Sequence, residues 1–266
     1  MKAFAAIDEW PCVAAAAAIF PNGSVSWYGD RSQSFALASV TKVLTAATVL
    51  IGVEEGSVSL DDVIDGRGAT LGDLLGHAAG LAPDGSVLDA PGRRRIYSNA
   101  GYERAASHLE AATEMAFGDY FQVGLLDPLG MVSTALTGSP AYAGSSSVED
   151  LVSFLVGLRS ILATETLAMM TSPYLPELIG VLPGYGRQAP NTWGIGPEIR
   201  SNKSPHWTGS TNSPRTWGHF GQAGTFIWTD PDIETSLVVL TDRPFGDWVL
   251  ERWPSLSDDV RTEVLG

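Results

Sequence analysis

Lysine, cysteine and histidine are all scarce in this chain of 266 residues, and each scarcity excludes a class of function. Lysine occurs only at positions 2, 42 and 203, while the formal net charge is -14. Binding a phosphate backbone or an anionic membrane surface needs several clustered cations, so we expect neither nucleic acid nor membrane as a partner. Cys12 is the only cysteine, which excludes an internal disulfide and a thiolate zinc site.

Metal and cofactor signatures are also missing. The 4 histidines show no close metal-ligand spacing, and no Walker lysine or complete dinucleotide fingerprint occurs. We therefore expect no metal and no cofactor.

No segment predicts a membrane span. The longest apolar run, Val43 to Val53, is too short to cross a bilayer. The first residues resemble a signal peptide, but Asp8 and Glu9 interrupt them. We favour a soluble, cytoplasmic protein and keep the signal peptide as the alternative.

Strand patterns at both ends of the chain enclose helix patterns in the middle. Residues 1–38 indicate strands and turns, with strands over 13–20 and 24–28 joined by a Pro-Asn-Gly turn. Further strands are predicted over 224–229 and 235–241. Helices are predicted over 41–55, 99–115, 147–158 and 248–264, and one more begins at Thr70. We predict an α/β (α+β) fold whose central antiparallel sheet is built from both termini and flanked by helices. Residues 1–60 and 175–266 would form the sheet domain, and 61–174 an inserted, mainly helical domain, with the active site in the cleft between them.

Lys42 is the only charged residue in an apolar helical segment, and Ser39 lies one turn before it. Residues three apart on a helix share a face, so the amine reaches the hydroxyl. Burial favours the neutral amine, which accepts a serine proton. The alternative is an N-capping serine followed by a lysine whose amine extends to the surface.

Two further fragments have the composition of a site. Tyr97 and Asn99 lie two residues apart in a turn before a helix, where a phenol and a carboxamide would face one site. Alternatively, Tyr97 is an anchor and Asn99 the helix N-cap. His219 and Gln222 lie in a glycine-rich segment, 218–224, which lets backbone approach backbone or ligand closely. The alternative there is a simple glycine-rich turn.

Together, these fragments resemble the serine β-lactamase and penicillin-binding-protein superfamily. The order Ser-x-x-Lys, Tyr-x-Asn, His-x-Gly is similar to its class C β-lactamase, D-aminopeptidase and esterase branch. Residues 74–81, Leu-Leu-Gly-His-Ala-Ala-Gly-Leu, and the Trp-Gly-Ile-Gly of 193–196 add to the resemblance. It implies the β-lactamase/transpeptidase-like fold, with a small molecule or peptide as substrate.

The resemblance also implies a mechanism. Ser39 would attack a carbonyl while Lys42 and Tyr97 accept and relay its proton, and Asn99 would orient Lys42. His219 would tune the Tyr97 proton or bind a substrate carboxylate.

The backbone has its own part in this mechanism. The backbone N–H groups of Ser39 and Gln222 would form the oxyanion hole. Gly221 and Gly224 would contact substrate.

One substitution limits the resemblance, because His219 occupies the place of a lysine that is usual in the β-lactamases of this branch. The expected reaction is therefore hydrolysis of an ester, an amide or a D-amino-acid peptide through an acyl-enzyme on Ser39. Two alternatives remain: a homologue that binds ligand without turnover, and an acyltransferase. Outside the site, we expect His77 to be a core histidine bonded to backbone, Arg93 to Arg95 to be a solvated loop, and Lys203 to be exposed in a polar turn.

Overall fold

The computed structural model describes residues 1–266. The helices are η1 (Lys2–Glu9), η2 (Ala38–Val40), α1 (Thr41–Glu54), α2 (Leu71–Leu75), α3 (Asn99–Thr113), α4 (Phe117–Phe121), η3 (Gln122–Leu126), α5 (Asp127–Leu129), α6 (Val148–Ile161), α7 (Thr164–Thr171) and α8 (Val249–Leu265). The strands are β1 (Ala14–Ile19), β2 (Val25–Tyr28), β3 (Phe35–Ala36), β4 (Ala135–Leu136), β5 (Gly144–Ser146), β6 (Gly180–Leu182), β7 (Gly186–Gln188), β8 (Glu198–Ile199), β9 (Trp217–Gly221), β10 (Thr225–Asp230) and β11 (Thr235–Thr241).

A 6-stranded sheet forms the centre of the molecule, in the order β2-β1-β11-β10-β9-β8. All neighbouring strands are antiparallel, and β1 pairs with β11 so that Ala16 lies opposite Val239. The β1–β2 hairpin turns at Gly23, whose φ of 79° suits a residue without a side chain. The predicted antiparallel sheet from both termini is confirmed.

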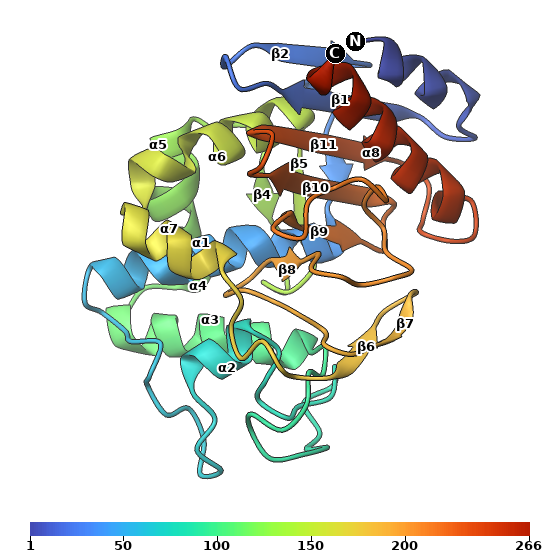
Figure 1. Ribbon diagram of the computed structural model, residues 1–266. Coiled ribbons are helices and arrows are strands. Elements are labelled where there is room, and N and C mark those ends of the chain that lie inside the picture. Colours follow the sequence, from blue (N-terminus) through green and yellow to red (C-terminus); the bar gives the residue numbers. More distant parts are fainter.

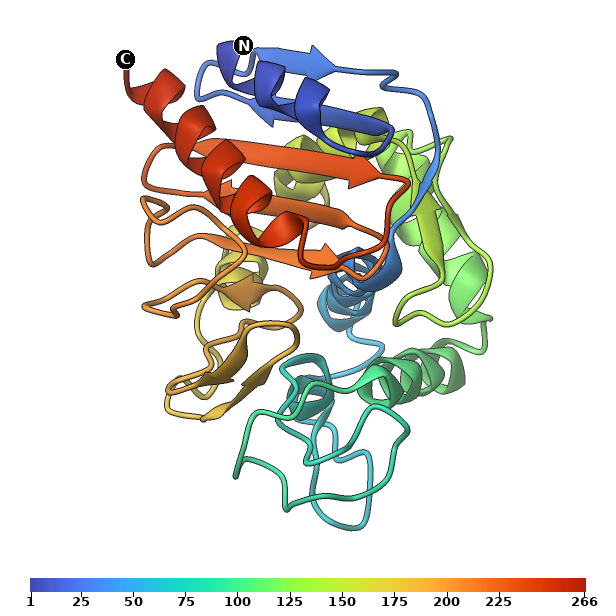
Figure 2. The same ribbon diagram turned by 90° about the vertical axis from the view of Figure 1, so that its right-hand side faces the viewer.

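Helices cover both faces of this sheet (Figures 1 and 2). Helices α8 and η1 lie together on one face, while α1 and α6 lie on the other. Alternate residues of β1 belong to two different core clusters: Ala15 and Ala17 are part of one, and Ala16 and Ala18 are part of the other. Because side chains of a strand alternate between faces, a strand covered on both sides must be apolar throughout, as this alanine run is.

The N-terminus differs from its prediction, since residues 2–9 form the 3-10 helix η1 instead of strands and turns. Phe4 and Ile7 are buried in the core cluster that contains α8 residues. The backbone N–H groups of Lys2 and Ala3 donate to the Glu263 carboxylate at 2.9 and 2.8 Å. These partners lie at the other end of the chain, where a local pattern does not reveal them.

Helix α1 is the central helix of the molecule and carries Lys42 in its first turn. Every residue from Thr41 to Gly52 is buried. A helix that is apolar all round belongs in a core. No helix in the structure has both the length and the apolar character of a membrane span.

The middle of the chain is less continuously helical than predicted. The predicted helix starts at Thr70 and Ser147 are confirmed, because both side chains accept a capping hydrogen bond. Residues 76–98, however, form a long loop, and β4 and β5 interrupt the helices. The largest core cluster joins Leu50, Leu109 and Val238, so apolar packing is continuous across the predicted domain boundary. The division at residues 61–174 stays a prediction.

Candidate active site

A cavity of about 270 Å³ lies where the end of β9 meets the N-terminal ends of α1 and α3. Its lining residues are Ser39, Pro83, Tyr97, Asn99, Leu182, Pro183, Trp193, His219, Phe220 and Gln222. The structure thus brings together predicted site residues from three distant parts of the sequence. Pro83, Leu182, Pro183, Trp193 and Phe220 complete the wall and were not among the predicted site residues.

Lys42 lies beside this cavity and is fully buried, so it does not extend to the surface. Its Nζ lies 3.4 Å from Ser39 Oγ, 2.7 Å from Asn99 Oδ1 and 2.8 Å from the Ala141 carbonyl oxygen. Burial lowers the pKa of Lys42 to about 7, and the more distant Glu103 carboxylate opposes this only in part. A large fraction of this amine is therefore neutral near neutral pH.

The Lys42 Nζ has three oxygen neighbours, which an ammonium would meet with three N–H groups and the neutral amine with two N–H groups and its lone pair. The Asn99 and Ala141 oxygens are carbonyl acceptors, so each takes one N–H of the amine. A neutral amine has two N–H bonds and one lone pair, and the remaining direction is toward Ser39 Oγ. The lone pair is therefore positioned to accept the Ser39 proton.

Asn99 is free to contact Lys42 because Ser98 caps helix α3. The Ser98 hydroxyl accepts from the Gly101 N–H at 3.1 Å, which excludes Asn99 as the N-cap. The Ser98 N–H in turn donates to His77 Nδ1 at 3.1 Å. His77 is buried, and the prediction of a core histidine bonded to backbone is confirmed. It holds the backbone between Tyr97 and Asn99.

Tyr97 lies over the Lys42 amine, with Nζ 4.7 Å from the ring centroid. The phenol ring also packs against aromatic groups, including the His77 ring at 4.5 Å between centroids. Burial raises the pKa of Tyr97, and a contact with the Ser39 hydroxyl opposes this shift. The phenol therefore keeps its proton at neutral pH.

His219 is buried at the cavity wall, 6.0 Å from the Tyr97 ring between centroids. Its Nδ1 lies 2.6 Å from the Phe220 carbonyl oxygen. Because a carbonyl only accepts, Nδ1 carries the proton and Nε2 is an acceptor. Nε2 has no partner in the chain. Burial, followed by the charge of Lys42, lowers the pKa of His219 to about 3, so the ring is neutral.

Gly221 and Gly224 do not line the cavity; both contact backbone of this chain. A Cβ on Gly221 would lie 2.2 Å from the Leu37 carbonyl oxygen, and one on Gly224 would lie 1.9 Å from that of Arg243. Leu37 also accepts from Thr225 Oγ1 at 2.9 Å. The glycine-rich segment thus lets β9 and β10 approach the chain just before Ser39, which brings Gln222 to the cavity. Substrate contact by the two glycines stays a prediction.

Replacing Gly221 with alanine should displace β9 from the Leu37 backbone. We expect a loss of about 1–3 kcal/mol in the free energy of unfolding, measured by urea denaturation, together with reduced turnover. Gly118→Ala is the control, because an added Cβ there meets open space. Equal stability of Gly221→Ala and the original chain would contradict this close packing.

Two basic residues outside the site differ from their predictions. Lys203 is buried rather than exposed, and its Nζ donates to the Thr192 carbonyl oxygen at 2.7 Å and to Glu198 Oε1 at 2.5 Å. Arg95 is also buried, although Arg93 and Arg94 are exposed as expected. Both buried side chains donate to main-chain carbonyl groups, and these partners are not visible in the polar local sequence.

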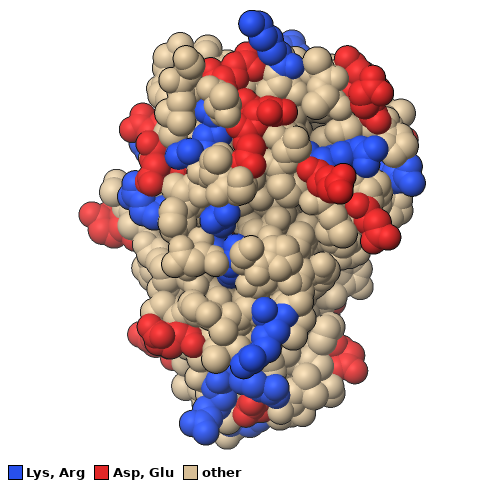
Figure 3. All heavy atoms as spheres, turned by 45° about the vertical axis from the view of Figure 1, so that its right-hand side comes forward, with Lys and Arg blue, Asp and Glu red and all other residues tan.

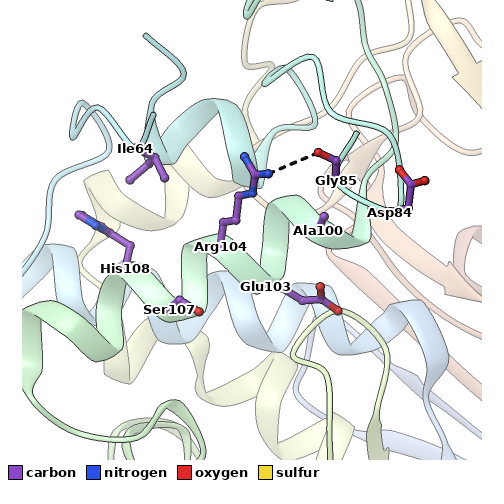
Figure 4. A pocket seen from close by; sticks show the side chains of 8 residues that line it. All are labelled: Ile64, Asp84, Gly85, Ala100, Glu103, Arg104, Ser107 and His108. Carbon is purple, nitrogen blue, oxygen red and sulfur yellow. Dashed lines mark hydrogen bonds between the residues drawn. The ribbon is translucent and has the colours of Figure 1, made fainter. Parts of the chain in front are cut away.

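A second hollow, of about 630 Å³, lies along the outer side of α3 (Figure 4). Its charged side chains already have partners: His108 Nε2 lies 2.9 Å from Asp62 Oδ2, and Arg104 donates to the Gly85 carbonyl oxygen at 3.3 Å. The Ser107 hydroxyl on its wall has no neighbouring base comparable to Lys42 among the lining residues. This hollow therefore lacks the arrangement found at Ser39.

Comparisons with known proteins agree with the fold and with the family resemblance. A β-lactamase from Mycobacterium bovis has a similar crystal structure, with a TM-score of 0.96, 46% identity, and coverage of 98% of this chain and 99% of that one. The D-amino acid amidase of Ochrobactrum anthropi shares the fold, with a TM-score of 0.80 at 18% identity over 99% of this chain and 100% of that one.

Among curated proteins, penicillin-binding protein 4* of Bacillus subtilis is 26% identical over an alignment of 134 residues, and the match covers 38% of this chain and 30% of that protein. The match thus spans about a third of that relative's length. The family model described as Beta-lactamase matches residues 11–257. The chain therefore belongs to the β-lactamase family.

Proposed function

We propose that this protein is a serine hydrolase that forms an acyl-enzyme on Ser39 and cleaves an ester, an amide or a D-amino-acid peptide bond. The observation that carries the proposal is the buried amine of Lys42, which lies 3.4 Å from Ser39 Oγ and has the Asn99 and Ala141 carbonyl oxygens as its other two neighbours. Ser39 and Tyr97 carry the only hydroxyl groups among the residues that line the cavity, so Ser39 is the only serine there.

In the proposed acylation step, Lys42 takes the Ser39 proton as Oγ attacks the carbonyl carbon. The backbone N–H groups of Ser39 and Gln222 would stabilise the oxyanion, worth roughly 3 kcal/mol for one donor in other enzymes. The proton then passes to the leaving group through Tyr97, whose phenol stays protonated until that step. Water hydrolyses the acyl-enzyme by the same route in reverse.

His219 contributes as a neutral acceptor in this proposal. Its bare Nε2 suits a hydrogen-bond donor, such as the Tyr97 phenol or a substrate N–H, and does not suit a carboxylate, which also only accepts. Of its two expected roles, we therefore propose the first.

The proposal is tested by turnover of p-nitrophenyl butyrate, D-phenylalanine amide and nitrocefin, with product release followed in each case. Release of product from any of them supports a hydrolase. A stable mass adduct without release would instead indicate a ligand-binding homologue. A product that appears only with an added alcohol or amine would indicate an acyltransferase.

The pH dependence of hydrolysis should report Lys42. Below pH 7 the amine is increasingly protonated and no longer accepts the Ser39 proton, because its pKa is about 7. We therefore expect kcat/KM to fall about tenfold per pH unit on the acid side of this value. His219 has a pKa of about 3 and therefore does not contribute to this decrease in kcat/KM. A rate that is constant from about pH 5 to 9 would contradict the assignment.

A further inference from the structure

A larger hollow, of about 740 Å³, borders the cavity at Ser39. Pro83, Tyr97 and Pro183 line both spaces, so the hollow, here called the outer cleft, opens directly beside the catalytic phenol. A substrate whose carbonyl group lies at Ser39 therefore has room to extend along one direction. What lines the outer cleft decides which extension it accepts.

The outer cleft has two walls, the loop around residues 93–97 and the β6–β7 hairpin, and Arg95 joins them. The Arg95 N–H donates to the Ile179 carbonyl oxygen at 3.0 Å, and Arg95 pairs with Gly180 in a parallel bridge. Its buried guanidinium donates to the carbonyl oxygens of Tyr174 and Asn191 at 2.6 and 3.1 Å. The walls are therefore held at a fixed separation.

The walls combine apolar surface with unpaired positive charge. Leu88, Ile179 and Val181 are 55%, 41% and 60% exposed, and all three line the outer cleft. Arg93 and Arg187 also line it, are exposed, and form neither an ion pair nor a side-chain hydrogen bond. Arg187 lies directly opposite Val181 in the hairpin, so an apolar and a cationic side chain share one face.

The neighbouring charges leave this region positive. Arg94 is paired with Asp89 at 2.6 Å, and Glu177 is the one acidic residue in the wall. In Figure 3, basic side chains gather over the lower part of the molecule, where residues 83–97 and β6–β7 lie in Figures 1 and 2. A positive region on a chain of net charge -14 attracts anions selectively.

We propose that the outer cleft binds the far end of the substrate, an apolar stem that ends in a carboxylate held by Arg93 and Arg187. This inference rests on the proposed hydrolase function and specifies its substrate class. The carboxylate belongs at this distance from the scissile bond because the inner cavity offers no free cation. Lys42 is already bonded to Asn99 and Ala141, and the unprotonated ring nitrogen of His219 only accepts.

The first test is binding, which does not depend on turnover. Ser39→Ala protein would be titrated with p-nitrophenyl hydrogen adipate and with its neutral methyl ester. A second pair carries the carboxylate on the leaving group: 3-(4-butanoyloxyphenyl)propanoic acid and its methyl ester. In at least one pair we expect the acid to bind about tenfold more tightly than the ester at low salt. Two exposed charge-assisted contacts contribute roughly this factor to an affinity. Adding Arg93→Ala and Arg187→Ala should abolish the preference, whereas Arg159→Ala, an exposed arginine elsewhere, should keep it.

The second test is the ratio of kcat/KM values for the acid and the neutral ester in the enzyme with Ser39 intact. This ratio should fall about tenfold in the double arginine variant and with rising salt. No preference for the acid in either pair, or a preference that survives loss of both arginines, would overturn the inference. If the acid binds preferentially but no ester is turned over, the inference about the outer cleft is retained. The same result would refute the hydrolase proposal.

Discussion

Replacing Ser39 with alanine should lower kcat/KM for ester hydrolysis by about 10⁴-fold or more, with the fold unchanged. The reason is that the reaction loses its nucleophile, and the remaining groups only polarise the carbonyl and position water. Ser39 is half-buried, and its hydroxyl is close enough to Lys42 for only a weak hydrogen bond at 3.4 Å, so little stability depends on it.

The assay compares purified wild type, Ser39→Ala and Ser107→Ala on p-nitrophenyl butyrate. Ser107 is a suitable control because it is an exposed serine in α3 outside the cavity. We expect Ser107→Ala to match wild type. Equal rates for wild type and Ser39→Ala would show that the observed hydrolysis does not use this site.

Replacing Lys42 with methionine should lower kcat by about 10³-fold, the size of a general-base contribution. Methionine fills a similar apolar volume, but it accepts no proton from Ser39. The acid limb near pH 7 should disappear in the residual activity, because the group that titrates there is gone. Circular dichroism would verify the fold, since the Asn99 and Ala141 oxygens lose their donor.

Lys2→Met is the control for this experiment, because Lys2 is exposed and does not line the cavity, and its backbone N–H donates to Glu263 of α8. It should retain the wild-type rate and pH profile. If Lys42→Met kept the acid limb near pH 7, the group that titrates there would be another residue and the assignment of the base would be wrong.

The sequence predicts the parts of the site that depend on local geometry. Ser39 and Lys42 are three residues apart on one helical turn, and this spacing alone places the amine near the hydroxyl. The apolar runs near both termini and the turn residues between them likewise predicted the antiparallel sheet, because both are local signals. The helix starts at Thr70 and Ser147 follow from capping side chains within three residues.

What depends on distant partners was not predictable in this way. Ala141, whose carbonyl oxygen accepts a hydrogen bond from Lys42 Nζ, lies 99 residues further along the chain. Arg95 lies in a polar segment that favours exposure, yet it is buried because the carbonyl oxygens of Tyr174 and Asn191, from distant segments, accept from its guanidinium. Lys203 is buried for a similar reason, although its partners Thr192 and Glu198 are nearer in the sequence. Buried charges of this kind are retained only when they are fully hydrogen-bonded, and that condition is visible only in three dimensions.

The central claim is that Ser39 becomes acylated, and peptide mapping of the trapped adduct tests it most directly. The protein would be mixed with a slowly released penicillin or an activated ester, quenched in acid, digested, and sequenced by mass spectrometry. We predict one added acyl group, located on Ser39 and absent from Ser39→Ala. An acyl group on any other residue, or the same adduct in Ser39→Ala, would contradict the account.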